Sequence, residues 1–169
     1  LKTMNNIMQS QRQNRKLKPW AIALIIIGAT LLVGFIGSLI GGKMDGSYQQ
    51  PPLHPADWVF PVVWTINYIA IGFAAFLTFQ ANQDRARRRN DLIWYGIHLV
   101  FNMLWPLFFF RLHLLAFSIF WLVFNIISAV IVACRFYKSF MAAGIIIIVY
   151  VMWLFYAFYL NCGVMVLNI

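Results

Sequence analysis

Aromatic and amide side chains recur at helical spacing in an otherwise apolar chain. His98, Asn102, Trp105 and Phe109 follow one another by four, three and four residues, so they line one face of a helix. Three other segments carry similar sets: Asp57, Pro61, Trp64 and Tyr68, with Asn67 beside them; Trp121, Asn125 and Ser128; and Tyr150, Trp153, Ala157 and Asn161. Flat aromatic walls with a few amides and almost no charge suit a rigid, planar, apolar ligand with a polar edge.

Acid–base and metal chemistry lack the residues that they need. The chain contains no Glu, and its four Asp residues, Asp45, Asp57, Asp84 and Asp91, are predicted to lie in loops or at helix ends. The three His residues do not follow a metal-ligand spacing such as HxxxH. We therefore predict no catalytic residue, no metal site and no required cofactor, and we interpret His98 as a structural or hydrogen-bonding residue.

Long apolar runs must position these residues. Hydrophobic residues make up 63% of the chain, against about 45–50% in a soluble domain. Each of five runs is long enough to cross a hydrocarbon layer, which takes roughly 20 helical residues. The sequence predicts an all-α, polytopic membrane protein with helices at about 19–41, 55–80, 91–110, 112–136 and 140–167.

A basic tail, residues 1–18, is predicted to precede the five-helix transmembrane domain at 19–169. Residues 1–3 come before a Met and are interpreted as an expression remnant. The first apolar run is about twice as long as the 7–15 apolar residues of a secretory signal, so we expect it to be retained as a helix.

The positive charge of the chain, +9 in total, gathers at the predicted helix ends. With the N-terminus inside, eleven Lys and Arg residues fall in inner segments and two, Lys43 and Arg111, fall in outer segments. The positive-inside rule therefore predicts an inner N-terminus and an outer C-terminus, most simply in a bacterial cytoplasmic membrane. The arginines at 85–89 are interpreted as a topology anchor near anionic lipid, and not as a nucleic-acid site.

Depth in the membrane decides which aromatic residues can meet. Trp64 and Asn102 each lie nine residues from the outer end of their helix, about 14 Å below the boundary at the helical rise. Trp105 is predicted slightly higher, and Trp153 near the middle of the membrane. These side chains can converge in the outer half of the bundle, although tryptophans that simply fill a core would show the same spacing.

The links between helices differ in length. Most are short, which predicts that sequential helices are antiparallel neighbours. The first outer loop, residues 41–55, is long and polar and has Tyr48 in its middle. A loop of this length is often a lid or binding element, and a solvated linker is the alternative. Gly34, Gly37 and Gly41 in the first helix could allow close helix approach.

Three ordered blocks of residues resemble the translocator protein family, the tryptophan-rich sensory proteins also called peripheral benzodiazepine receptors. The first block, at 51–68, is Pro-Pro-Leu-x-Pro-x-x-Trp-Val-Phe-Pro-x-x-Trp-x-x-x-Tyr. The second, at 102–109, is Asn-x-x-Trp-Pro-x-Phe-Phe, and the third, at 150–161, begins Tyr-x-x-Trp-Leu and ends Leu-Asn. The resemblance extends from residue 20 to residue 168.

This resemblance implies a five-helix bundle, found as a homodimer, with a ligand cavity under the first loop. It implies binding of porphyrins such as protoporphyrin IX and heme, and of benzodiazepine- or isoquinoline-type ligands. Spacing and resemblance together predict a ligand-binding set composed of Trp64, Asn67, Tyr68, Asn102, Trp105, Phe109, Tyr150, Trp153 and Asn161, with Tyr48, Pro51 and Pro55 in the loop.

Departures from the family pattern limit what the resemblance implies. The C-terminal cholesterol motif of animal members needs Tyr and Arg, whereas this chain reads LNCGVMVLNI, so we do not expect cholesterol as a ligand. Leu53 stands where relatives often have Trp, which argues against light-dependent porphyrin breakdown. A receptor or transport-type protein is therefore the first hypothesis. A membrane enzyme that photo-oxidises porphyrin and a scaffold without a small ligand are the alternatives.

Overall fold

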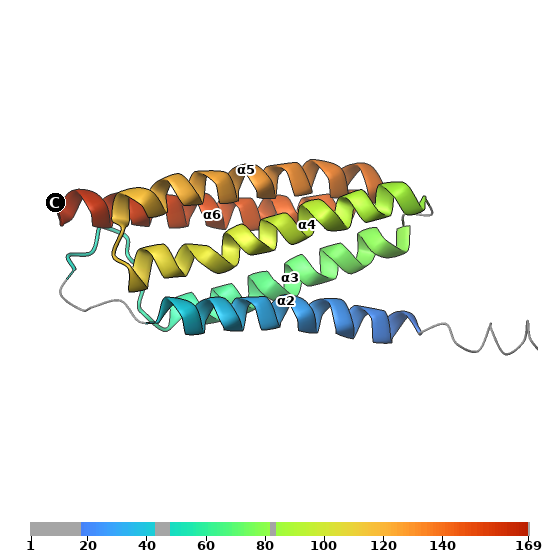
Figure 1. Cartoon of the computed structure of the whole chain (residues 1–169), viewed down its shortest axis with the longest axis horizontal. Coiled ribbons are helices and arrows are strands. Elements are labelled where there is room, and N and C mark those ends of the chain that lie inside the picture. Colours follow the sequence, from blue (N-terminus) through green and yellow to red (C-terminus); the bar gives the residue numbers. More distant parts are fainter. Residues whose placement is uncertain (1–17, 43–47, 82–83, 169) are drawn as a thin grey trace, which may run out of the picture.

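The apolar runs form five long α-helices in the computed structural model of the chain, which describes residues 18–42, 48–81 and 84–168. The helices alternate in direction (Figure 1). Their bounds are Pro19–Gly41 (α2), Val59–Ala81 (α3), Arg85–Pro106 (α4), Leu115–Ser139 (α5) and Met141–Leu167 (α6), and a π-helical turn, Leu107–Arg111 (η1), extends α4. The predicted five-helix bundle is confirmed, while the basic tail before residue 18 lies outside the described residues.

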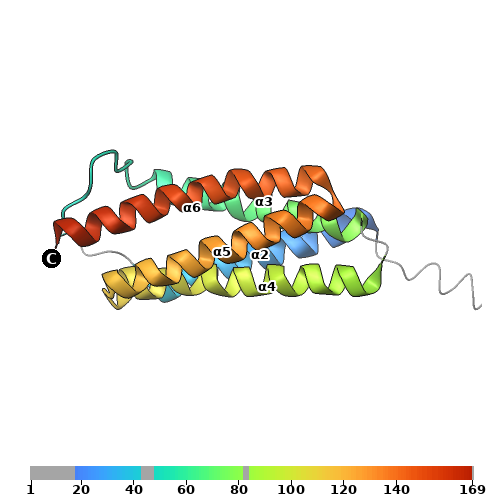
Figure 2. The same cartoon turned by 90° about the horizontal axis from the view of Figure 1, so that it is seen from above.

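The helices close into a ring that does not follow their order in the chain. Helix α2 packs against α3 and α4, α5 packs against α4 and α6, and α3 packs against α6 (Figures 1 and 2). The prediction that each short link joins close neighbours is wrong for α3 and α4. These two helices have little backbone contact, because they face each other across the interior and meet through long side chains.

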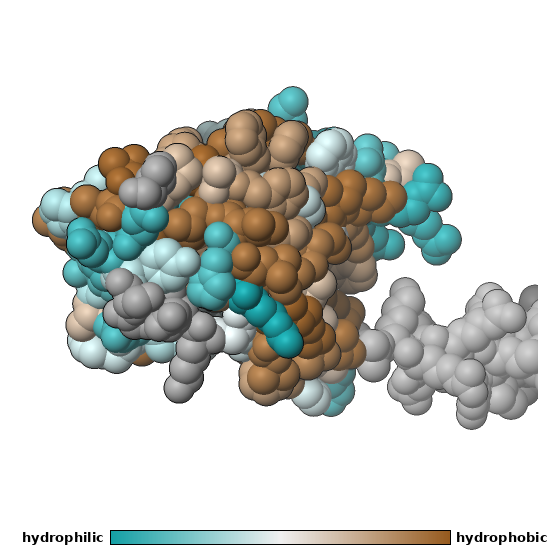
Figure 3. Space-filling model, turned by 60° about the vertical axis from the view of Figure 1, so that its left-hand side comes forward, coloured by the Kyte–Doolittle hydropathy of each residue, from teal (hydrophilic) through white to brown (hydrophobic). Residues whose placement is uncertain are grey.

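The outer surface of the ring is apolar. Large hydrophobic side chains on all five helices are exposed, among them Leu24 at 63%, Phe120 at 67% and Met152 at 67%. Figure 3 shows apolar residues over much of one face of the molecule. All five helices are long and apolar enough to cross a membrane. Because a soluble protein could not leave so large an apolar surface in water, the chain is an integral membrane protein.

The two ends of the bundle are named here by the residues that they hold. We use "loop end" for the end that holds residues 48–58, residues 112–114 and the C-terminal end of α6. We use "arginine end" for the opposite end, which holds residues 84–89 and the α5 to α6 link (Figure 1).

Helix α3 begins at Val59, four residues later than the predicted start at residue 55. The chain before it forms two turns, and the Val59 amide closes the second by donating to the Ala56 carbonyl at 2.9 Å. Asp57 is therefore exposed and outside the helix, which corrects its place on the predicted helical face. Pro61 falls in the first turn of α3, where a missing N–H costs no helical hydrogen bond.

Helix α4 begins at Arg85, six residues earlier than the predicted start at residue 91. The Asp84 carboxylate caps this helix by accepting from the Ala86 amide at 2.9 Å. The early start places Asp91 inside the helix and only 2% exposed, which corrects its predicted position at a helix end. Its carboxylate accepts from Arg135 Nε at 2.9 Å and from Ser139 Oγ at 3.0 Å, so it ties α4 to the end of α5.

The last two helices are shifted by smaller amounts. Helix α5 starts and ends three residues later than predicted, at residues 115 and 139, and α6 starts one residue later, at 141.

The π-helical turn follows Pro106, whose ring cannot continue the α-helical hydrogen-bond ladder.

The small-residue face of α2 packs against α4. A Cβ atom added at Gly37 would lie 3.1 Å from the Met103 carbonyl oxygen, and one at Gly41 would lie 2.5 Å from Pro106 Cβ. Gly28, on the same helix, has open space around it. Glycine at residues 37 and 41 therefore permits the close approach that the spacing predicted.

We expect Gly41→Ala to destabilise the bundle by about 1–3 kcal/mol, because the added methyl overlaps the rigid ring of Pro106. Gly28→Ala is the matched control, and it should be neutral or stabilise α2 by up to about 1 kcal/mol. Thermal unfolding in detergent measures both. Equal unfolding temperatures for the two variants would show that the α2 and α4 contact is not tight.

Candidate functional site

The amide of Asn102 joins three helices inside the bundle. The Tyr68 hydroxyl on α3 donates to Asn102 Oδ1, and Asn102 Nδ2 donates to the Tyr150 hydroxyl on α6 at 2.5 Å. Asn102 and Tyr150 are 2% and 1% exposed. An unpaired amide would be costly at this depth, so the arrangement fixes α3, α4 and α6 relative to one another.

A cluster of aromatic rings lies beside this amide. Trp64 on α3 is at its centre, with ring centroids 5.9 Å from Tyr68, 6.4 Å from Trp105 and 6.3 Å from Trp153. Trp105 stacks on Phe109 at 5.2 Å with an interplanar angle of 16°. These separations are those of directly packed aromatic pairs. The structure thus brings together five of the predicted residues, which we call the tryptophan cluster.

Two indole N–H groups of the tryptophan cluster are buried without a partner in the described residues. Trp105 Nε1 and Trp153 Nε1 make no hydrogen bond within the described ranges. By contrast, Trp121 Nε1 donates to the Phe101 carbonyl at 2.8 Å. Buried indole N–H groups normally find an acceptor. The two free donors are therefore available to an acceptor atom supplied by a ligand.

His98 adds an acceptor beside the tyrosines. Its ring lies edge-on to that of Tyr150, with centroids 5.5 Å apart. The single hydroxyl proton of Ser128 goes to the Asn125 carbonyl, so at 3.0 Å Ser128 Oγ must accept from His98 Nδ1. His98 Nε2 is then an acceptor, and it has no partner among the described residues. The interpretation of His98 as a hydrogen-bonding residue is confirmed.

The first loop is tied to α6 by hydrogen bonds that sequence reasoning missed. The Tyr156 hydroxyl donates to the Leu53 carbonyl at 2.6 Å, and the Tyr159 hydroxyl donates to the Pro52 carbonyl at 2.7 Å. Pro51 is buried, and its ring would meet a Cβ atom at Gly163 at 2.5 Å. In the sequence, the only sign of this contact is that Tyr156 and Tyr159 lie three residues apart near the end of a predicted helix. The loop therefore lies along the end of α6 (Figure 2).

The loop also contacts the tryptophan cluster from the loop end of the bundle, through Phe60. His54 packs on Phe60 with centroids 5.3 Å apart, and Phe60 packs on Trp153 at 6.3 Å. Pro55, predicted to shape the loop, is half-buried next to His54. Leu53 is 81% exposed and has a φ of +65°, a left-handed conformation that costs a non-glycine residue about 1–2 kcal/mol.

Other predicted residues have partners elsewhere. Tyr48 stacks on His113 with centroids 5.6 Å apart, and its hydroxyl lies 3.2 Å from His113 Nδ1. Asn161 Oδ1 accepts from Ser118 Oγ at 3.1 Å. Asn67 is buried, and its Nδ2 has no partner in the part of the chain that the structure describes. Tyr48 and Asn161 thus support the loop end and do not belong to the tryptophan cluster.

Aromatic rings fill the region in which the sequence predicted a ligand cavity. Two surface hollows, of about 520 and 460 Å³, lie toward the arginine end. A ligand could enter the tryptophan cluster only if its rings separate. Trp64 and Trp153 are half-buried, whereas Trp105 is only 8% exposed, so the first two rings have the most freedom to move.

We expect Tyr68→Phe and Tyr150→Phe each to lower the free energy of unfolding by about 1–3 kcal/mol, because each leaves one group of the buried Asn102 amide unpaired. Tyr137→Phe is the control, since Tyr137 is 48% exposed, and it should change stability by less than about 0.5 kcal/mol. Unfolding in detergent and SDS mixtures compares the three variants. A loss no larger than that of the control would contradict the role assigned to Asn102.

The chain is similar to known proteins over most of its length. A sequence profile described as the TspO/MBR family matches residues 21–167. The chain is 28% identical over 148 residues to a protein named Tryptophan-rich protein TspO from Chlorobaculum tepidum, covering 85% of this chain and 94% of that protein.

Two further relatives are similar over most of their length. A Tryptophan-rich sensory protein from Cereibacter sphaeroides is 28% identical over 152 residues, covering 88% of this chain and 92% of the relative. A Translocator protein from Bos taurus is 26% identical over 151 residues, covering 85% and 88%. With a profile match over all five helices, this integral membrane protein belongs to the TspO/MBR family.

Proposed function

We propose that this protein is a membrane receptor or transport-type protein that binds porphyrins, such as protoporphyrin IX and heme, and other flat apolar ligands at the tryptophan cluster. The observation that carries the proposal is the pair of buried, unpartnered donors, Trp105 Nε1 and Trp153 Nε1, on two rings that both pack against Trp64. A planar tetrapyrrole has apolar faces for the indole rings and polar groups at its edge that can accept from these donors.

The neighbouring hydrogen bonds suit a binding site whose walls keep their positions. Because the Asn102 amide already serves Tyr68 and Tyr150, its role in this proposal is to hold the two tyrosines, and the indole groups contact the ligand. His98 Nε2 offers a further acceptor to a ligand N–H. Trp64 is the ring that must move to admit a planar molecule, and Tyr156 holds the loop above it.

We expect Trp105→Phe and Trp153→Phe to weaken protoporphyrin IX binding by about three- to tenfold each, because they keep an aromatic ring and remove only a hydrogen-bond donor. Titration of the purified protein in detergent, followed by the porphyrin absorbance band, measures the affinity without depending on the number of tryptophans.

Trp121→Phe is the matched control, because the indole of Trp121 already donates to a backbone carbonyl. It should leave the affinity within twofold of the unsubstituted protein. Absence of binding at micromolar porphyrin would refute the proposal. Equal weakening in all three variants would show that the tryptophan cluster is not the site.

We also infer the orientation from charge. Of the described basic residues, only Arg111 lies at the loop end, and the other seven lie toward the arginine end: Lys18, Arg85, Arg87, Arg88, Arg89, Arg135 and Lys138. The positive-inside rule then favours the arginine end on the inner side of a bacterial cytoplasmic membrane, with the loop end and the tryptophan cluster toward the outside.

Single-cysteine labelling tests this orientation. In a chain carrying Cys134→Ser and Cys162→Ser, a membrane-impermeant maleimide should label Ala56→Cys in intact spheroplasts. It should label Arg87→Cys only after lysis, because both positions are exposed but lie at opposite ends of the bundle. The reverse pattern would place the arginine end outside.

A further inference from the structure

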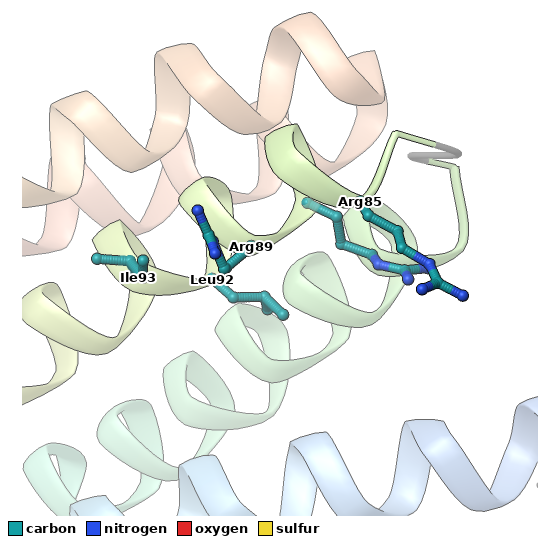
Figure 4. A pocket seen from close by; sticks show the side chains of 5 residues that line it. Arg85, Arg89, Leu92 and Ile93 are labelled. Carbon is teal, nitrogen blue, oxygen red and sulfur yellow. The ribbon is translucent and has the colours of Figure 1, made fainter.

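A basic hollow lies at the arginine end, far from the tryptophan cluster. It measures about 520 Å³ and is lined by Arg85, Arg88, Arg89, Leu92 and Ile93. Figure 4 shows Arg85, Arg89, Leu92 and Ile93 on the first turns of α4. The spacing of the five lining residues, three, one, three and one, is that of a single helix face.

The arginines of this hollow are like charges without compensation. Within the described ranges, no carboxylate forms an ion pair with Arg85, Arg88 or Arg89, and the ion pair of Asp91 goes to Arg135. The three charges also lie at the positive end of the α4 dipole. The Asp84 carboxylate already caps this end of the helix, so mutual repulsion among the three arginines is what favours a bound anion. Arg88 is held in place by the ring of Phe79, with its guanidinium carbon 4.6 Å from the ring centroid.

The apolar part of the hollow shows what kind of anion would fit. Leu92 is half-buried and Ile93 is 51% exposed, and both face the same hollow as the guanidinium groups. They lie about 10 Å further along the helix axis than Arg85, on the side of the hydrocarbon layer. Charged donors near the membrane boundary with apolar contacts beneath them match a phosphate head group and the start of its acyl chains.

We propose that this hollow is a binding site for one anionic phospholipid from the leaflet at the arginine end. Arg85, Arg88 and Arg89 bind the phosphate, and Leu92 and Ile93 contact the acyl chains. The site needs more than diffuse attraction to a charged surface, because it uses one stripe of α4 and leaves out Arg87, which is exposed in the same run but does not line the hollow.

Native mass spectrometry of the full chain in detergent tests the site, with phosphatidylglycerol and phosphatidylcholine of the same acyl chains as probes. We expect phosphatidylglycerol to bind at least tenfold more tightly. Arg89→Gln should weaken that binding by about fivefold, the effect of one basic residue near a lipid surface. Arg87→Gln, which makes the same change in net charge, should stay within twofold.

Further variants separate the parts of the proposal. Ile93→Ala should weaken phosphatidylglycerol binding, whereas Ile97→Ala, one turn along the same helix and also exposed, should not. Arg89→Lys should restore part of the loss caused by Arg89→Gln, because it keeps the charge but not the bidentate geometry. Thermal unfolding verifies that each variant is folded, and the paired controls make the comparison independent of small stability changes.

Three results would overturn the proposal. Equal weakening by Arg87→Gln and Arg89→Gln would indicate diffuse electrostatic attraction. Equal binding of the two lipids would show that the net negative charge of the head group does not contribute to binding. Displacement of phosphatidylglycerol by 10 mM glycerol 3-phosphate or inorganic phosphate, with no effect of Ile93→Ala, would assign the hollow to a soluble phosphate compound.

Discussion

The amide of Asn102, held between the hydroxyls of Tyr68 and Tyr150, is the interaction on which the interior of this bundle depends. A hydrocarbon environment offers no water to satisfy an amide, so both of its groups need protein partners. One partner lies on α3 and the other on α6. Neither helix is a neighbour of α4 in the ring, where α4 packs against α2 and α5. Pairing of a single side chain therefore fixes the separation of three helices. The same separation sets the positions of the aromatic rings that pack beside it.

Other polar residues of α4 obey the same requirement at successive turns. Asp91 pairs with Arg135 and Ser139 on α5, Tyr95 lies 2.5 Å from the Thr30 hydroxyl on α2, and His98 pairs with Ser128 on α5. Each of these α4 side chains is buried. Polar contacts between transmembrane helices stabilise association where the hydrophobic effect contributes little. Helix α4 thus carries most of the cross-links, and the exposed faces of the other helices are free to remain apolar.

Two of the buried polar groups that lack partners in the described residues lie where the function is proposed. Trp105 and Trp153 retain unpaired donors around Trp64, and the first loop above them is fastened to α6 by Tyr156. At the opposite end, three arginines of α4 lack carboxylate partners in the described part of the chain. The two proposals therefore assign different ligands to the two ends: a flat apolar molecule among the indoles and an anionic head group beside the arginines. Neither site needs the other, so the proposals can be tested separately.

The sequence by itself determined the five helices, their alternating direction and the set of inward faces, because apolar length and helical periodicity are local properties. Spacing predicted that Trp64, Asn102 and Tyr150 face the interior. Only the tertiary structure decided that α3 and α4 face each other across a ring, since ring order depends on packing between distant segments. It also decided that Tyr48 pairs with His113, that Asp91 is buried, and which indoles lack acceptors. Hydrogen-bond partners distant in the chain leave no periodic signal, so only the folded arrangement could supply them.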